Sequence, residues 1–153
     1  MATFTGTNNN DTLTGTSSND FFLMGGSGGT DVIDGGAGFD AIEFRERATS
    51  AVIVDFVAGT ITGGSSGTIS FTNIERVVAG NFNDRLSGNA SSQTLTGQSG
   101  ADTLWGAGGA DTLWGGAGAD TFIFREIGPA NADAINDFTS GSDKLLLDGT
   151  VMT

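Results

Sequence analysis

The chain has 153 residues, enough for one domain, and its 18 acidic against 6 basic residues give a formal charge of −12. It has no cysteine and no histidine, which excludes disulfides, thiol and imidazole metal ligands, and the catalytic triads that depend on them. The charge argues against nucleic acid or an anionic membrane as the main partner, and no apolar run reaches the roughly 20 residues of a membrane span.

Glycine and aspartate are the two overused residues. Glycine contributes 26 residues, and 14 of the 18 acidic residues are aspartate, which turns favour, rather than glutamate, which helices favour. An acidic, glycine-rich chain is often disordered. A hydrophobic content of 37%, with 11 phenylalanines and 2 tryptophans at regular spacing, indicates a folded repeat instead.

The first predicted block, residues 1–44, contains a nine-residue repeat. Four units begin at Gly6, Gly15, Gly26 and Gly35, and each has aspartate at position six and a large apolar residue at position eight. Two extra residues, 24–25, interrupt the register between the second and third units, where we expect a bulged turn.

The second predicted segment, residues 45–78, leaves the nonapeptide pattern. Strands are expected at 51–56, 68–71 and 74–78, with glycines marking the turns between them. Its length is close to two coils of the repeat, so we expect the solenoid to continue through it with broader, metal-free turns. The acidic residues here are interpreted as surface charge or arginine partners rather than paired catalytic carboxylates: Glu43, Glu46, Asp55 and Glu75.

The third predicted segment, residues 79–124, returns to the repeat with five units. Over all nine units, position one is glycine in eight, position six is aspartate in eight, and position eight is always large and apolar. Gln93 is the exception at position six, so the site it shares should be weak or absent. Ser18, Phe82 and Ser91 replace glycine at position four, where we expect distorted turns.

The last segment, residues 125–153, is expected to cap the exposed end of the solenoid with a strand or short helix. Asp137 is expected to add a metal ligand at the last turn, whereas Asp133 and Asp143 are interpreted as turn or surface residues.

The repeat itself predicts an all-β fold. Positions seven to nine form a short strand with one inward apolar side chain, and positions one to six form a glycine-rich turn. Two units make a coil of about 18 residues, and stacked coils form one continuous right-handed parallel β-roll, or β-helix solenoid, with two sheets. One apolar side chain in nine residues makes a thin core that needs further stabilisation.

The aspartates are the source of that stabilisation. Residues two units apart lie on the same edge of the solenoid, so their carboxylates stack and repel unless a cation lies between them. Hard oxygen ligands at flexible spacing suit Ca²⁺, and they suit Mg²⁺ less well because it demands stricter octahedral geometry. Five internal sites are expected, from the pairs Asp11–Asp31, Asp20–Asp40, Asp84–Asp102, Asp102–Asp120 and Gln93–Asp111.

These units resemble the GGxGxDxUx nonapeptide of RTX (hemolysin-type) calcium-binding repeats. The resemblance implies a β-roll in which the aspartates and the carbonyls of the glycine turns hold Ca²⁺ between adjacent turns. The tail, through residues 122–124, 133–138 and 141–147, is similar to the segment after such arrays in serralysin-type secreted proteases. The ligand positions that the resemblance implies are Asp11, Asp20, Asp31, Asp40, Asp84, Asp102, Asp111 and Asp120, with the turns around Gly26, Gly35, Gly36, Gly38, Gly97, Gly100, Gly106, Gly109, Gly115, Gly116 and Gly118.

Trp105 and Trp114 occupy position nine and are expected to point outward on opposite sheets. They either cover the sheet and pack on the tail, or contact a partner or sugar.

Three functions are compatible with these features. The leading hypothesis is a non-catalytic, secreted module, exported by a type I route, that folds on binding Ca²⁺ outside the cell. The second is a Ca²⁺-dependent structural or adhesive unit of a surface layer, biofilm or adhesin, with self-association or with cell-surface or polysaccharide contact. The third is an accessory module of a larger secreted enzyme; the chain itself lacks the HExxH zinc motif of a protease.

Overall fold

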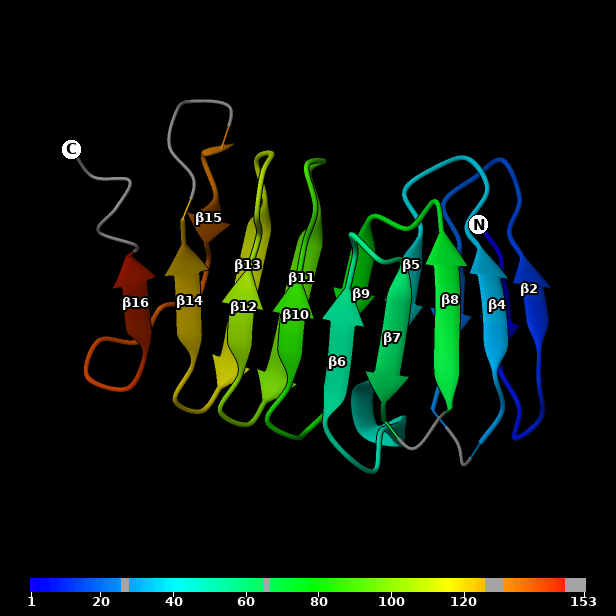
Figure 1. Ribbon diagram of the computed structural model, residues 1–153, viewed down its shortest axis with the longest axis horizontal. Coiled ribbons are helices and arrows are strands. Elements are labelled where there is room, and N and C mark those ends of the chain that lie inside the picture. The colour runs from blue at the N-terminus through cyan, green and yellow to red at the C-terminus, as the bar shows by residue number, and fades with distance from the viewer. Residues whose placement is uncertain (26–27, 65–66, 126–130, 148–153) are drawn as a thin grey trace.

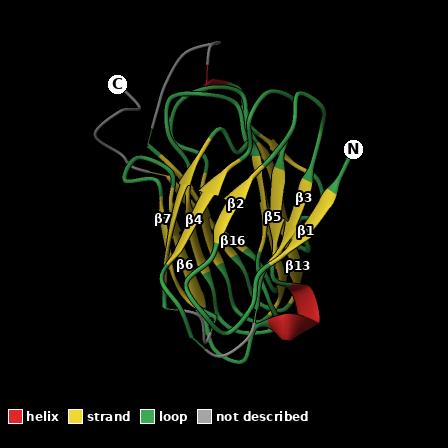
Figure 2. Ribbon diagram, turned by 90° about the vertical axis from the view of Figure 1, so that its right-hand side faces the viewer, coloured by secondary structure: helices red, strands yellow, loops and turns green. Residues whose placement is uncertain are grey.

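The computed structural model describes residues 1–25, 28–64, 67–125 and 131–147. In this part of the chain sixteen β-strands form two sheets, stacked face to face, with turns along both edges (Figures 1 and 2). The one helical element described is a single 3₁₀ turn, η1 (Arg45–Arg47).

Sheet A has seven strands and sheet B has nine. Sheet A runs in the order β1 (Thr3–Thr5), β3 (Phe21–Leu23), β5 (Ala41–Glu43), β9 (Arg76–Val78), β11 (Thr94–Ser99), β13 (Thr112–Ala117) and β15 (Ala134–Ile135). Sheet B runs in the order β2 (Thr12–Thr14), β4 (Asp31–Asp34), β8 (Thr68–Thr72), β7 (Thr60–Gly63), β6 (Val52–Asp55), β10 (Arg85–Ser87), β12 (Thr103–Trp105), β14 (Thr121–Phe124) and β16 (Lys144–Leu147).

The strand register confirms the predicted coil. Leu104 lies opposite Leu86 and Phe122 in parallel neighbours, so one coil in the second block is 18 residues long. In the first block Leu13 lies opposite Ile33, a separation of 20 residues that includes the insertion at 24–25. Both inserted residues are described: Met24 is buried and joins the core, and Gly25 has a positive φ angle of +120°.

The core is a single column of apolar side chains between the sheets. The position-eight residues of all units except the first are at most 1% exposed: Phe22, Ile33, Ile42, Leu86, Leu95, Leu104, Leu113 and Phe122. Because strand side chains alternate between faces, the residues on either side of each point outward or lie at the turn. The repeat period therefore sets both the core and the position of the aspartate two residues earlier.

The segment between the two blocks differs from the expected pair of coils. The three predicted strands are present as β6, β8 and β9, but a fourth strand, β7, runs antiparallel between β6 and β8. These three consecutive antiparallel strands, β6, β7 and β8, form a meander that belongs entirely to sheet B. In sheet A, β5 pairs directly with β9. Hairpin turns explain the difference: Gly59, Gly63 and Gly64 have positive φ angles, and Asp55 accepts a hydrogen bond from the Ala58 N–H at 2.9 Å.

The tail forms a further coil. β15 pairs in parallel with β13, and β16 pairs with β14, so the described part of the tail extends both sheets (Figure 1). Among the described strands β16 lies at the edge of sheet B, and its three leucines, Leu145, Leu146 and Leu147, are each about half exposed at 50–51%.

The close stacking of turns predicts a strong effect of one glycine substitution. Gly118 has φ +147°, and a Cβ there would overlap the carbonyl oxygen of Gly100 in the preceding coil. Gly118→Ala should lower the free energy of unfolding of the Ca²⁺-loaded protein by more than about 1 kcal/mol. Gly108→Ala is the control, because φ there is not positive and the nearest atom, the Ala90 Cα, lies 3.4 Å from the added Cβ. Urea denaturation measures both variants, and equal midpoints would contradict the stacking geometry.

Candidate metal centre

The side chains that stand at or just before the start of each strand, acidic except for Gln93, form a column along each edge of the roll. The first column precedes the strands of sheet B and contains Asp11, Asp31, Asp84, Asp102, Asp120 and Asp143. The second column precedes the strands of sheet A and contains Asp20, Asp40, Glu75, Gln93, Asp111 and Asp133. The β6–β8 meander interrupts the first column between Asp31 and Asp84.

Successive members of a column are joined by a hydrogen bond. The peptide N–H of Asp84 donates to Oδ1 of Asp102 at 2.7 Å, and that of Asp102 donates to Oδ1 of Asp120 at 2.9 Å. The same contact joins Asp11 to Asp31 at 2.9 Å, Asp20 to Asp40 at 2.7 Å and Gln93 to Asp111 at 2.6 Å. The structure therefore brings together all five expected pairs. A charged acceptor makes these bonds stronger than ordinary backbone hydrogen bonds.

The second carboxylate oxygen divides the aspartates into two groups. In Asp11, Asp20 and Asp84, Oδ2 accepts the peptide N–H of the residue four positions earlier, at 2.6–3.0 Å. Within the described residues, Oδ2 of Asp40, Asp102 and Asp120 is buried and has no hydrogen-bond partner. A buried anionic oxygen without a donor is unfavourable, and a cation bound to these three oxygens would remove that cost.

The turn conformation accounts for this difference. In the three turns with an unpartnered Oδ2, the residue at position two has a positive φ angle: +90° at Gly36, +88° at Gln98 and +100° at Gly116. The Gly36 and Gly116 N–H groups donate to other carboxylates, those of Asp34 and Asp137. The glycine at position one is also required, because a Cβ at Gly35 would lie 2.9 Å from Oδ2 of Asp40.

The pKa values of the two groups differ in the same way. Burial, with the nearby charges of Asp84 and Asp120, raises the pKa of Asp102 to about 7, despite the hydrogen bond from the Asp84 backbone. Burial likewise raises the pKa of Asp40 and Asp120.

Aspartates with both oxygens satisfied behave differently. Burial alone would raise the pKa of Asp20, but hydrogen bonds from Thr16 and Ala2 lower it below its ordinary value. The pKa of Asp143 is lowered in the same way by the N–H groups of Thr139 and Asp120. Asp84 is intermediate, since both its oxygens are hydrogen-bonded and burial still raises its pKa.

The remaining ligands must come largely from the backbone. No group of three or more acidic side chains gathers at one point in the described residues. Carbonyl oxygens lie between the turns, since those of Gln98 and Gly100 pack against Gly116 and Gly118 of the next coil. One or two carboxylate oxygens with several carbonyl oxygens is a set of hard ligands that fits Ca²⁺.

Sequence reasoning missed three members of the columns. Oε2 of Glu75 accepts the Asp40 N–H at 2.8 Å, so Glu75 occupies an aspartate position rather than the free surface. Asp133 and Asp143 accept the N–H groups of Asp111 and Asp120 at 3.0 and 3.1 Å, and so continue the columns rather than serving as plain turn residues. Each stands two positions before an apolar residue that pairs with a position-eight residue of the neighbouring strand, and that spacing could have identified them: Val77, Ile135 and Leu145.

Two expected ligand positions need separate comment. Asp137 lies outside both columns, and its two oxygens accept the N–H groups of Gly115 and Gly116 at 3.0 and 2.7 Å. Gly26 lies outside the described residues.

A family model for the RTX calcium-binding nonapeptide repeat, in four copies, matches residues 5–42, 71–92 and 87–122. These matches cover more than half of the chain. The chain belongs to this RTX repeat family. No curated protein matches the chain. Among the described residues, no helix has the length and hydrophobicity needed to span a bilayer.

The RTX columns predict an unusual pH dependence when metal is removed. Folded Asp102 holds a proton up to about pH 7, whereas the unfolded chain holds it only up to about 3.8. Because the folded state binds more protons in this window, the chelated protein should become more stable as the pH falls from about 7 to about 4. Below that, protonation of Asp20 and Asp143, whose pKa values are lowered, should reverse the trend.

The folded fraction in excess chelator, measured by far-ultraviolet circular dichroism across this range, tests the expectation. A β-type signal that rises steadily from pH 4 to pH 7 would contradict it.

Proposed function

We propose that this chain is a calcium-dependent structural module that folds when it reaches Ca²⁺ outside the cell. The observation that carries the proposal is the set of buried Oδ2 atoms of Asp40, Asp102 and Asp120, which have no hydrogen-bond partner in the described residues. Burying a carboxylate oxygen without a donor or cation is costly, and a bound cation removes that cost.

The eight repeat aspartates and the carbonyls of their glycine turns are the proposed ligands, and their hydrogen bonding ranks the five sites. The pair Asp102–Asp120 contributes two unpartnered oxygens and should be the strongest site. The pairs Asp20–Asp40 and Asp84–Asp102 contribute one each. In the pair Asp11–Asp31, Oδ2 of Asp11 is satisfied by Thr7, so this site should be weaker. The uncharged Gln93 should weaken the pair that it forms with Asp111.

Coupling between metal and folding follows from the same geometry. Metal that binds only the folded state stabilises it by RT ln(1 + [L]/Kd) at each site, about 2.7 kcal/mol when [L] is 100 Kd. Extracellular calcium modules have Kd values near about 10⁻⁴–10⁻³ M. At such affinities the low Ca²⁺ of a cell interior leaves the chain unfolded, and the repeat family, which is typical of secreted bacterial proteins, supports export before folding.

A non-catalytic role is part of the proposal. The family match and the described architecture are those of a repeat array, in which the buried carboxylates are engaged in contacts between coils. The module would therefore act through its folded shape, alone or attached to a larger secreted protein.

Calcium titration of the intact chain tests the proposal. Far-ultraviolet circular dichroism should change from a disordered to a β-type spectrum as Ca²⁺ is added, with a midpoint in the range of extracellular calcium modules, and Mg²⁺ should not replace it. The fluorescence of Trp105 and Trp114 should report the same transition, because both lie in strands of the second block, β12 and β13. An unchanged β-type spectrum after complete removal of Ca²⁺ would contradict the proposal.

Substitution of Asp102 is the sharper form of the same test. Asp102→Asn keeps the Oδ1 acceptor for Asp84 but removes the buried charge, so it should lower the bound Ca²⁺ and shift the midpoint upward. Asp55→Asn is the matched control, with the same charge change and the same kind of retained Oδ1 acceptor, in a hairpin turn outside the columns. Equal calcium content in both variants would contradict the ligand assignment.

A second candidate function, a self-assembling unit of a surface layer or matrix, is favoured by the exposed leucines of β16, which lies at the edge of sheet B among the described strands. Exposed apolar edge strands pair with other chains unless they are protected. This function predicts that the Ca²⁺-loaded protein sediments as assemblies and that Leu146→Lys disperses them. A strictly monomeric Ca²⁺-loaded protein would exclude this candidate and leave the first one intact.

A further inference from the structure

The outer face of sheet A carries a row of side chains that the calcium columns do not use. Position-nine residues of neighbouring strands lie in register: Leu23 opposite Glu43, Glu43 opposite Val78, and Val78 opposite Thr96. Thr96 lies in turn opposite Trp114. A second row two residues earlier contains Arg76 opposite Thr94.

η1 turns this flat face into a groove. After β5 the chain continues alongside β9, with the N–H of Phe44 donating to Val78 and that of Arg45 to Ala79. Arg45 then adopts φ +47°, a left-handed conformation that is strained for a residue with a side chain, and the chain turns over the sheet. Gly25, in the two-residue insertion, leaves the space that Arg47 fills, since a Cβ there would overlap Arg47.

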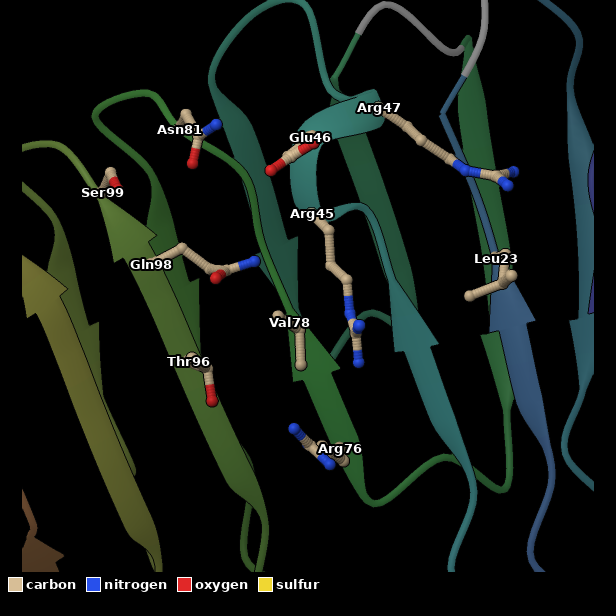
Figure 3. A pocket seen from close by; sticks show the side chains of 10 residues that line it. All are labelled: Leu23, Arg45, Glu46, Arg47, Arg76, Val78, Asn81, Thr96, Gln98 and Ser99. Atoms are coloured by element: carbon tan, nitrogen blue, oxygen red, sulfur yellow. The ribbon is translucent and has the colours of Figure 1, made fainter.

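The resulting groove has a volume of about 820 Å³ and is rich in arginine. Three of the chain's six basic residues line it, although the chain as a whole carries −12. Figure 3 shows Arg45 and Arg76 over β9, with Arg47 reaching toward Leu23 on β3. Asn81, Gln98 and Ser99 supply neutral hydrogen-bonding groups along the other side.

The acidic groups beside these arginines leave a positive excess. Glu43 is 2% exposed and contacts Arg45 at 2.7 Å, so it orients this guanidinium from below rather than facing the groove opening. Glu46 lines the rim. Nε of Arg76 is buried and has no hydrogen-bond partner in the described residues. The groove and its immediate surroundings thus contain three guanidinium groups and two carboxylates, so positive charges outnumber negative ones.

An aromatic hollow continues the groove across the sheet. It has a volume of about 380 Å³, and Arg76 and Thr96 line both spaces. Phe39 and Trp114, which are 44% and 40% exposed, form its other side. Trp105 on the opposite sheet differs, because the guanidinium of Arg125 lies 5.2 Å from its ring centroid. From β3 to β13 the combined surface crosses four strand spacings, about 19 Å.

We propose that this surface, formed by the arginine groove and the aromatic hollow, binds an acidic polysaccharide rich in uronate residues. Guanidinium groups pair with carboxylates in a planar, two-bonded geometry, which suits repeated carboxylates on an extended polymer. The exposed ring of Trp114 offers an apolar face with a polar edge, which suits a sugar ring. An open groove that crosses several strands accommodates a chain of sugars rather than a compact ligand.

The test uses the intact, Ca²⁺-loaded chain and short oligogalacturonates, at a fixed Ca²⁺ concentration that saturates folding. Calorimetry and Trp114 fluorescence should both detect binding, binding should weaken with added salt, and neutral malto-oligosaccharides should not bind. Arg47→Gln with Arg76→Gln should reduce affinity at least about tenfold, as expected for the loss of charge-assisted hydrogen bonds. Arg85→Gln is the matched control, since Arg85 is exposed on β10 in sheet B.

Three outcomes would overturn the inference: no binding to the wild type, equal binding by the groove variant and the Arg85→Gln control, or binding that Asp102→Asn abolishes while the groove variant retains it. The last result would show that bound Ca²⁺ itself captures the carboxylates. Circular dichroism of every sample separates these results from a failure of Ca²⁺-dependent folding, and a heparin or nucleic acid titration shows whether another polyanion is preferred.

Discussion

The roll depends on one recurring contact, a carboxylate oxygen that accepts the peptide N–H of the corresponding residue in the preceding coil. This contact holds the carboxylate against the backbone of the neighbouring turn and thereby aims its second oxygen. Whether that second oxygen finds a donor depends on the residue four positions earlier. Where that residue has a positive φ angle, as at Gly116, the oxygen of Asp120 is left without a partner. The same motif therefore builds either a closed hydrogen-bonded turn or an incomplete one that a cation can complete.

This contact also explains why glycine is placed where it is. Turns stack closely enough that carbonyl oxygens of one coil touch the Cα atoms of the next, as at Gly100 and Gly118. Any side chain there would separate the coils and break the hydrogen bonds between carboxylate and peptide. The thin core cannot compensate, because each unit buries one large apolar side chain. The close stacking of the turns, together with the acidic columns, is thus what mainly holds successive coils together along the solenoid axis.

Much of the fold could be predicted from the sequence because the same nine-residue period recurs in nine units. The position of Leu104 in the core and its pairing with Leu86 follow from that period alone. β7 could not be predicted in the same way, because a hairpin meander and a pair of solenoid coils bury similar apolar residues and differ in turn conformation. Glu75 was missed because its longer side chain reaches an aspartate position from a segment with no repeat.

The candidate site shows the same limit. Position six identifies which carboxylates stack. Both Asp20 and Asp102 occupy this position, yet Oδ2 is hydrogen-bonded in Asp20 and has no partner in Asp102 among the described residues. The difference lies in the turns. In the turn before Asp20, Thr16 donates to the carboxylate from its N–H and its hydroxyl. In the turn before Asp102, Gln98 adopts a positive φ angle, which cannot be predicted from a glutamine in the sequence. A glycine at position two would have been a signal, as in the turns of Asp40 and Asp120, but the turn of Asp102 lacks it.

Three departures from the repeat lie close together, beside the arginine groove. The proposed polysaccharide surface is therefore separate from the calcium-binding turns. The insertion at Gly25, the 3₁₀ turn at Arg47 and the junction of β5 with β9 lie together at the carboxyl ends of neighbouring strands in the middle of sheet A. A regular coil there would continue the acidic columns and leave the outer face flat. The meander places its three strands in sheet B, and the 3₁₀ turn that leads from β5 to β6 carries the arginines Arg45 and Arg47. A solenoid can therefore acquire a binding groove without loss of its calcium turns, provided that the added chain leaves and rejoins the sheets in register, as β5 and β9 do.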